Sequence, residues 1–212
     1  MRLTRGPRRT IKAPSDGPRT PEEARIQATF HAFKAGITGA KGEASVREVL
    51  ATLGTPALHD VIVRDQRGLT QIDHLVRTPD AIVVLETKCY GGIISGELDG
   101  RTWTQRFPDS SEQFELPNAV RQNYRHLMAV EASIGNSSVS VRSFVVAAGS
   151  ATFEGKLRDV LVPLTDLRRV LSGSPSPSLR WLDGAWQKLQ ALAAQSPTLR
   201  EAHRHEIDSR RS

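Results

Sequence analysis

Several features that mark common protein classes are scarce or absent in this sequence of 212 residues. The single cysteine, Cys89, excludes an internal disulfide and any zinc site built mainly from cysteine. No apolar run approaches the roughly 20 residues that span a bilayer, and no apolar stretch of a secretory signal follows the basic N-terminus. These absences predict a protein of the reducing cytoplasm that has no membrane-spanning segment.

Positive charge, in contrast, is abundant: the formal net charge is +6 and the isoelectric point is about 10.0. Clustered positive charge attracts nucleic-acid phosphates through counterion release, although a basic surface without a dedicated partner has the same composition. We interpret residues 1–19 as a basic, disordered arm, with a plain disordered terminus as the alternative. Its cations stand among glycines and prolines: Arg2, Arg5, Arg8, Arg9, Lys12 and Arg19.

Apolar periodicity predicts an α/β fold in which a mixed β-sheet is flanked by helices. A capping box begins a helix at Thr20, and its apolar pattern resumes at residues 46–53 after several glycines. The other main elements are expected in this order: strands at 58–64, 69–77 and 81–88, a helix at 116–134, and a strand at 141–148. Shorter strands are expected at 92–98, 102–104 and 160–163, and a helix at 164–171.

The same reading divides the chain into four segments. Residues 1–19 are the basic arm and residues 20–171 the main domain. Residues 172–178, rich in serine and proline, are a linker by composition. Residues 179–212 are expected to form a short amphipathic helix followed by a polar, frayed tail.

Polar side chains interrupt the two strands that flank the turn at residues 78–80. Because side chains alternate along a strand, Glu86 and Lys88 share one face of theirs. If the hairpin pairs Arg77 with Ile82, Asp73 lies opposite Glu86, with β-carbons about 4.5–5.5 Å apart. Two carboxylates so close repel each other unless a cation lies between them. This register predicts a site for a hard divalent cation, Mg²⁺ with Mn²⁺ as a substitute.

The same register places Gln71 opposite Lys88, whereas His74 points to the other face and is predicted to be a packing residue. The alternative is a Glu–Lys ion pair that closes the edge of the sheet, with Asp73 a solvated strand residue. Glu43 adds a third carboxylate, because a helical wheel places it on the face that packs against the sheet. A helix-start glutamate favoured by the helix dipole is the alternative there.

Taken together, these motifs resemble the nuclease-related domain (NERD) family of the PD-(D/E)xK nuclease superfamily. The resemblance covers roughly residues 38–148. It rests on these matches: Gly42-Glu43, Gln71-Ile72-Asp73-His74, Glu86-Thr87-Lys88 with Tyr90, then Gly92, Ile94 and Gly96, then Trp103, Asn118, Gln122-Asn123 and His126.

This resemblance implies a restriction-endonuclease-like core and divalent-metal hydrolysis of phosphodiester bonds. It also implies the role of each matching side chain. Asp73 and Glu86 would be metal ligands, Glu43 would assist the metal through a water, Lys88 would stabilise the attacking water or the developing charge, and Gln71 and Gln122 would be polar residues beside them.

The sequence therefore predicts a Mg²⁺-dependent nuclease that acts on DNA by a metal-activated water. The alternative is a non-catalytic nucleic-acid-binding or regulatory module on a nuclease-like fold. A homodimer is a further expectation, because cutting both strands of a duplex often uses two sites. Four arginines are candidate phosphate contacts, with ordinary solvated charge as the alternative: Arg101, Arg106, Arg121 and Arg125.

Overall fold

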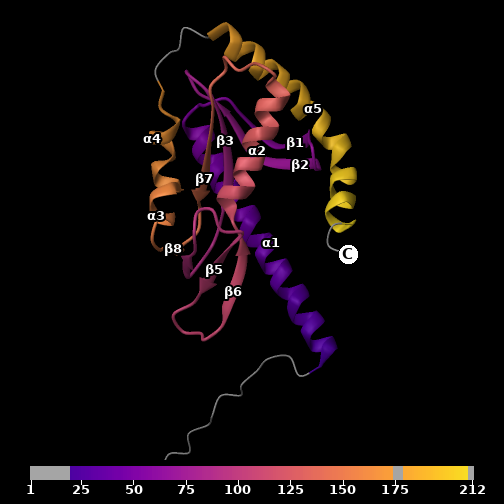
Figure 1. Ribbon diagram of the computed structural model, residues 1–212, viewed down its shortest axis with the longest axis vertical. Helices are drawn as coiled ribbons and strands as arrows, with labels where there is room; N and C mark the ends of the chain where they lie inside the picture. Colours follow the sequence, from indigo (N-terminus) through magenta and orange to yellow (C-terminus); the bar gives the residue numbers. More distant parts are fainter. Residues whose placement is uncertain (1–19, 174–178, 210–212) are drawn as a thin grey trace, which may run out of the picture. The chain divides into compact units, whose positions relative to one another are not determined.

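The computed structural model describes residues 20–173 and 179–209, with all their side chains except those of residues 22–37 and 179 (Figure 1). The basic arm and most of the expected linker lie outside the described residues. The chain divides into two units, one before and one from Thr38 onward. Helix α1 (Pro21–Thr52) crosses that boundary, and its part from Thr38 onward belongs to the second unit.

The main sheet has five strands in the spatial order β1-β2-β3-β7-β9. The β1–β2 and β2–β3 pairs are antiparallel, whereas β3–β7 and β7–β9 are parallel. The sheet is therefore mixed, as the order of elements predicts. Its strands are β1 (Ala57–Asp65), β2 (Gly68–Arg77), β3 (Ile82–Lys88), β7 (Val141–Ala147) and β9 (Leu161–Pro163).

A second, smaller sheet continues from the carboxyl end of β3, in the order β6-β5-β4-β8. It packs around Trp103, which is 1% exposed, together with Ile94 and Leu157. Sequence periodicity predicts two of these strands and misses β6 and β8. The strands are β4 (Ile93–Ser95), β5 (Thr102–Arg106), β6 (Gln113–Pro117) and β8 (Thr152–Phe153).

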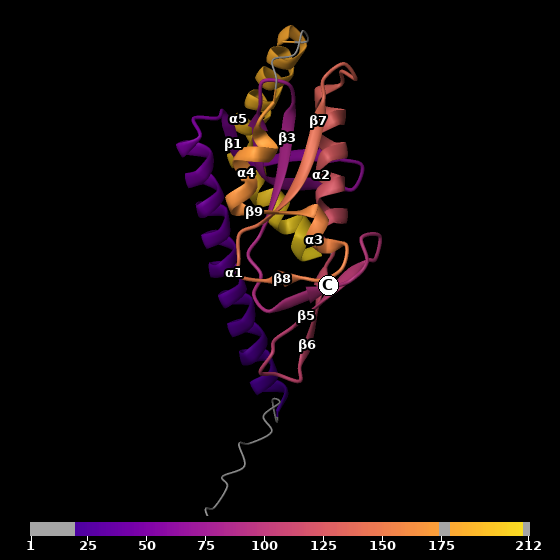
Figure 2. The ribbon, with the colours of Figure 1, turned by 90° about the vertical axis from the view of Figure 1, so that its left-hand side faces the viewer.

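Helices cover both faces of the main sheet (Figures 1 and 2). On one face, α2 and α5 pack on Val61, Leu75 and Val84. On the other, α1 and α4 pack on Val83 and Leu85. This layered α/β arrangement confirms the predicted fold class and is consistent with a restriction-endonuclease-like core. The helices after α1 are α2 (Ala119–Ile134), α3 (Leu157–Val160), the 3₁₀ helix η1 (Leu164–Asp166), α4 (Leu167–Leu171) and α5 (Leu179–Ser209).

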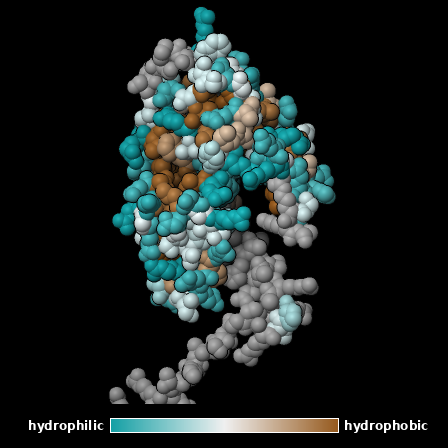
Figure 3. Space-filling view, in the orientation of Figure 1, coloured by the Kyte–Doolittle hydropathy of each residue, from teal (hydrophilic) through white to brown (hydrophobic). Residues whose placement is uncertain are grey.

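The covering on the α4 side is incomplete. Phe144, Leu164 and Val170 pack against the core there but are only partly buried. In the space-filling view, apolar residues show between hydrophilic ones over the region of α4 and β7 (Figure 3). Among the described helices, none has the length and hydrophobicity needed to cross a membrane.

The register of the β2–β3 hairpin is the one that the sequence predicts. Arg77 pairs with Ile82 and His74 pairs with Leu85. The paired residues end there, one step before Asp73 and Glu86. Both carboxylates therefore lie at the point where the hairpin opens.

Helix α2 begins three residues later than predicted, at Ala119 rather than Leu116. Leu116 and Pro117 belong to β6, and Asn118 is the residue that caps the helix. The Asn118 side-chain oxygen accepts hydrogen bonds from the backbone N–H groups of Val120 and Arg121. Such a cap satisfies amides at the helix start that have no partner within the helix.

The prediction of a short C-terminal helix with a frayed tail is wrong, because α5 continues to Ser209. The polar residues of its second half bind the sheet backbone. The Ser196 hydroxyl accepts a hydrogen bond from Ile62 N at 2.9 Å, and the Glu206 carboxylate accepts one from Leu69 N at 2.8 Å. Ile62 lies on the edge strand β1, so the Ser196 contact covers a backbone group that would otherwise be open to another chain, whereas Leu69 lies at the start of β2.

A glycine in α1 allows the helix to approach the end of β3 closely. A β-carbon at Gly42 would lie 2.8 Å from Cys89 Cβ, whereas one at Gly39 would have no neighbour within 4 Å. The sequence suggested that Gly39 and Gly42 interrupt the helix, but α1 runs through both of them without a break. Instead, Gly42 brings the adjacent Glu43 against the sheet.

This difference predicts opposite effects of the same substitution at two glycines of one helix. Gly39→Ala should raise the free energy of unfolding by about 0.5–1 kcal/mol, because alanine favours a helix over glycine. Gly42→Ala should lower it by about 1 kcal/mol, because overpacking at Cys89 outweighs that gain. Urea unfolding of both variants measures the two signs, and an equal stabilisation by both would contradict the close approach.

Candidate active site

Glu86 and Lys88 lie on the face of β3 that α2 covers, and two residues of α2 hold them. Lys88 Nζ lies 2.5 Å from Glu86 Oε1 and donates a hydrogen bond to Gln122 Oε1 at 3.1 Å. His126 Nδ1 lies 3.2 Å from Glu86 Oε2, without the alignment of a hydrogen bond. Gln122 and His126 are four residues apart, so they project from the same side of the helix.

Burial and neighbouring charge act in opposite directions on this pair. Burial alone would raise the pKa of Glu86, whose side chain is 2% exposed, but His126 and the Lys88 ammonium outweigh burial and lower that pKa. Burial alone would lower the pKa of Lys88, but the charges of Glu86 and Tyr90 raise it. Both groups are therefore charged at neutral pH.

Asp73 lies beside Glu86 where the β2–β3 hairpin opens. Its Oδ2 accepts a hydrogen bond from Thr87 N at 2.8 Å. Burial, and next the charge of Glu86, raise the pKa of Asp73 to about 8. The two carboxylates are thus close enough to repel each other, as the predicted register requires.

Glu43 reaches the same place from α1. Burial raises the pKa of the Glu43 carboxyl, and so do the charges of Asp60 and Glu86, whereas the charge of Arg47 opposes them. It makes no hydrogen bond or ion pair with any residue that the structure describes. Glu43 lies well inside α1 rather than in its first turn, so the helix dipole does not explain its position.

The expected contact between Gln71 and Lys88 is not formed. Gln71 pairs with Ile62 of β1, and its Nε2 donates a hydrogen bond to Asp60 Oδ1 at 3.0 Å. The paired residues of β2 and β3 end at His74, so the register cannot be extended to Gln71. Gln71 is therefore held beside Asp60, a residue that sequence reasoning did not select.

His74 is fully buried, as predicted for a packing residue. Its Nδ1 lies 2.8 Å from His59 Nδ1 on the neighbouring strand. Burial, followed by the charge of His59, lowers the pKa of His74 to about 3. The ring is therefore neutral at physiological pH.

The four candidate phosphate contacts are surface residues, and three of them already bind protein groups. Arg125 pairs with Asp65 through two contacts at 2.5 and 3.0 Å. Arg106 lies 2.5 Å from Glu154, and Arg121 donates to Asp99 O at 3.0 Å. Arg101 is exposed. Their contact with nucleic acid stays a prediction.

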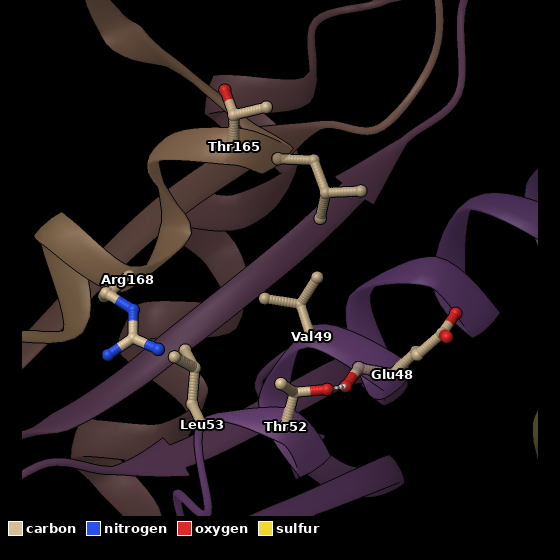
Figure 4. A pocket seen from close by; sticks show the side chains of 7 residues that line it. Glu48, Val49, Thr52, Leu53, Thr165 and Arg168 are labelled. Atoms are coloured by element: carbon tan, nitrogen blue, oxygen red, sulfur yellow. Dashed lines mark hydrogen bonds between the residues drawn. The ribbon is translucent and has the colours of Figure 1, made fainter.

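A separate hollow of about 330 Å³ lies between the end of α1 and the η1–α4 segment (Figure 4). Val49, Leu53 and Leu164 line it, and Glu48 and Arg168 are its charged residues. Figure 4 shows Thr52 bound to the Glu48 backbone rather than directed at a reactive group. No candidate catalytic residue lines this hollow, so the hollow and the polar cluster are different places.

Comparison with known protein families identifies the domain that contains this cluster. The sequence profile of the nuclease-related domain, NERD, matches residues 38–148, which contain every residue of the cluster. This chain belongs to the nuclease-related domain family. An uncharacterized protein of Bacillus anthracis is 37% identical over 97 residues, a stretch that is 44% of this chain and 45% of that protein. The chain thus matches about half the length of this curated relative.

The sequence reasoning gave no role to several neighbours of the cluster in this NERD domain. His126 could have been found from its spacing, since it follows Gln122 by one helical turn. Tyr90 could have been found by strand parity with Lys88, although β3 ends at Lys88. Asp60 gave no such signal, because its position depends on a local backbone conformation.

Proposed function

We propose that this NERD domain is a metal-dependent nuclease that hydrolyses phosphodiester bonds, with DNA as its substrate, in the cytoplasm. The single observation that supports the proposal is the grouping of Glu43, Asp73 and Glu86 beside the Lys88 ammonium where β2 and β3 separate. A domain that only binds nucleic acid has no need of buried, mutually repelling carboxylates. A metal-dependent hydrolase needs such carboxylates as ligands for its cation.

The residues present fit a hard divalent cation such as Mg²⁺ or Mn²⁺. Their donor atoms are carboxylate oxygens, and the buried Glu86 Oε2 makes no hydrogen bond. Among the described residues, no three His, Cys, Asp or Glu side chains converge as a complete cage. Mg²⁺ does not require one, because it commonly takes one or two carboxylates and fills its remaining positions with water and phosphate. Asp73 and Glu86 would hold the cation, with Glu43 beside them.

When bound, the cation would polarise the scissile phosphate and acidify a water. The protein contributes position and charge. Glu86 Oε1 and Gln122 Oε1 fix Lys88 Nζ on the α2 side of the cluster. There its positive charge opposes the negative charge that grows on the phosphate in the transition state. The bond from Thr87 N fixes Asp73, so one carboxylate oxygen is oriented by the neighbouring strand.

Incubation of the full chain with supercoiled plasmid, single-stranded DNA and RNA tests this proposal. Each substrate is mixed with Mg²⁺, Mn²⁺ or EDTA. Metal-dependent cutting of DNA supports the proposal, and cutting of RNA alone would correct the substrate. Salt-sensitive binding without cutting would replace it with the non-catalytic alternative. Native mass with and without duplex DNA tests the proposed homodimer.

His126 should act as a positioning residue for Glu86 in this site. His126→Ala should weaken Mn²⁺ binding about 10-fold, because groups that orient metal-binding carboxylates typically contribute that much. His126→Gln, which retains a polar side chain beside Glu86, should recover part of the affinity. Calorimetric titration with Mn²⁺ measures both. His205→Ala, at an exposed position of α5, is the matched control. Unchanged affinity in His126→Ala would remove this role.

A further inference from the structure

Asp60 adopts a backbone conformation that is rare for its residue type. Its φ angle is 54°, and it is the one non-glycine residue with positive φ in the described part of the chain. Left-handed conformations cost free energy for residues with a β-carbon, and they persist where the surroundings enforce them. Such positions are frequent at functional sites, so the cause of this one needs a physical explanation.

The unusual conformation switches the side to which β1 residues point. Before Asp60, Ala57 packs towards α1 and Leu58 towards α2 and α5. Regular alternation would place Val61 on the side of Ala57, yet Val61 packs towards α2 and α5. The pairing with β2 keeps its register on both sides of the switch, from His59–His74 to Val61–Ile72. Asp60 therefore sits opposite Asp73 without belonging to a regular pair.

The conformation allows the Asp60 carboxylate to bind two groups at once. Arg47 Nη2 of α1 lies 2.5 Å from Asp60 Oδ2, and Gln71 Nε2 donates to Asp60 Oδ1 at 3.0 Å. Arg47 follows Glu43 by one helical turn, a spacing at which glutamate and arginine commonly form an ion pair. Here Arg47 instead binds Asp60, and Glu43 has no ion-pair partner in the part of the chain that the structure describes.

We propose that Asp60 is a positioning residue that holds Arg47 away from Glu43, so that the Glu43 carboxylate stays available to the site formed by Asp73 and Glu86. The strained backbone at Asp60 places its carboxylate between Arg47 and Gln71. Without that carboxylate, Arg47 would turn to Glu43 and neutralise it. The role of Glu43 at a metal site rests on the proposed function, whereas the effect of Asp60 on the position of Arg47 does not.

A rescue experiment tests this role. Asp60→Asn keeps a side chain that tolerates positive φ and an oxygen for Gln71, but it removes the charge that binds Arg47. It should weaken Mn²⁺ binding and lower kcat for DNA cleavage by about 10-fold. Arg47→Met alone should leave both close to wild type. The double variant Asp60→Asn with Arg47→Met should recover most of the loss. A double variant as impaired as Asp60→Asn would overturn the proposal.

A second measurement keeps this inference separate from the proposed function. Urea unfolding of single and double variants at Glu43 and Arg47 gives the coupling between these two residues. A weak coupling is expected in the wild-type background, where the Arg47 charge acts on Glu43 without an ion pair, and a larger stabilising coupling is expected with Asp60→Asn. A coupling of equal size in both backgrounds would overturn the control of Arg47. Failure of the wild-type protein to bind metal or cut nucleic acid, with the larger coupling present, would overturn the proposed function alone.

Discussion

Replacement of Lys88 by alanine is expected to reduce DNA cleavage about 100- to 1,000-fold while the protein stays folded. Loss of one preorganised positive group that faces the developing charge has effects of this size. The loss should appear in kcat rather than in KM, because the group acts on the transition state more than on the bound substrate. Single-turnover cleavage with saturating Mg²⁺ measures it.

The Lys88 prediction needs a control for folding, because Lys88 also neutralises the buried Glu86. Lys88→Met retains most of the packing of the alkyl chain and should lose the same activity. Lys188→Ala is the matched lysine control, since Lys188 binds the carbonyl of Ile134 at the far end of α2. Circular dichroism should show native secondary structure in all three variants. Undiminished cutting by a folded Lys88→Ala protein would contradict the assigned role.

The sequence predicted the part of the site that depends on strand geometry alone. The spacing of Asp73, Glu86 and the turn between them defines one hairpin register, and that register is formed. It failed at Gln71, two residues further, because the strands have separated there and β1 changes its side-chain alternation at Asp60. A register can be counted from a turn, whereas a left-handed residue inside a strand leaves no periodic signal.

The polar contacts that α2 and α5 make were harder to predict than the strand register. Gln122 lies on the polar side of α2, so a helical wheel built on the apolar residues does not predict that it contacts the site. It nevertheless reaches Lys88 because the end of β3 is itself polar. In the second half of α5, the polar residues Ser196 and Glu206 bind backbone N–H groups of β1 and β2. In both cases a polar residue faces the protein, which binary patterning cannot distinguish from exposure to solvent.

Asp73→Asn should make the metal-free protein more stable, although Asp73 is a proposed metal ligand. In the metal-free protein the pKa of Asp73 is raised to about 8, by burial first and by Glu86 second. Between its ordinary value near 4 and this value, the unfolded chain releases the proton and the folded protein keeps it. The free energy of unfolding should therefore fall as pH rises through this window, by at most about 1.4 kcal/mol per pH unit. Asparagine does not titrate, so the variant lacks this decline.

In EDTA at pH 8, Asp73→Asn should be more stable than wild type by about 2–4 kcal/mol, which corresponds to about 5–10 °C in Tm. Near pH 3 the difference should become small, because the wild-type carboxyl is then mostly protonated in both states. Addition of Mg²⁺ at pH 8 should raise the Tm of wild type and leave the variant unchanged, since a ligand stabilises only the state that binds it. Thermal unfolding over pH, with and without metal, gives all three comparisons. A variant that is less stable than wild type in EDTA at pH 8 would show that Asp73 supports the fold. If the variant is more stable than wild type in EDTA at pH 8 but Mg²⁺ changes the Tm of neither protein, Asp73 is a destabilising buried carboxylate that binds no cation. A site in which Asp73 and Glu86 share a cation predicts one combination: Asp73 destabilises the metal-free protein, and Mg²⁺ raises the Tm of wild type alone.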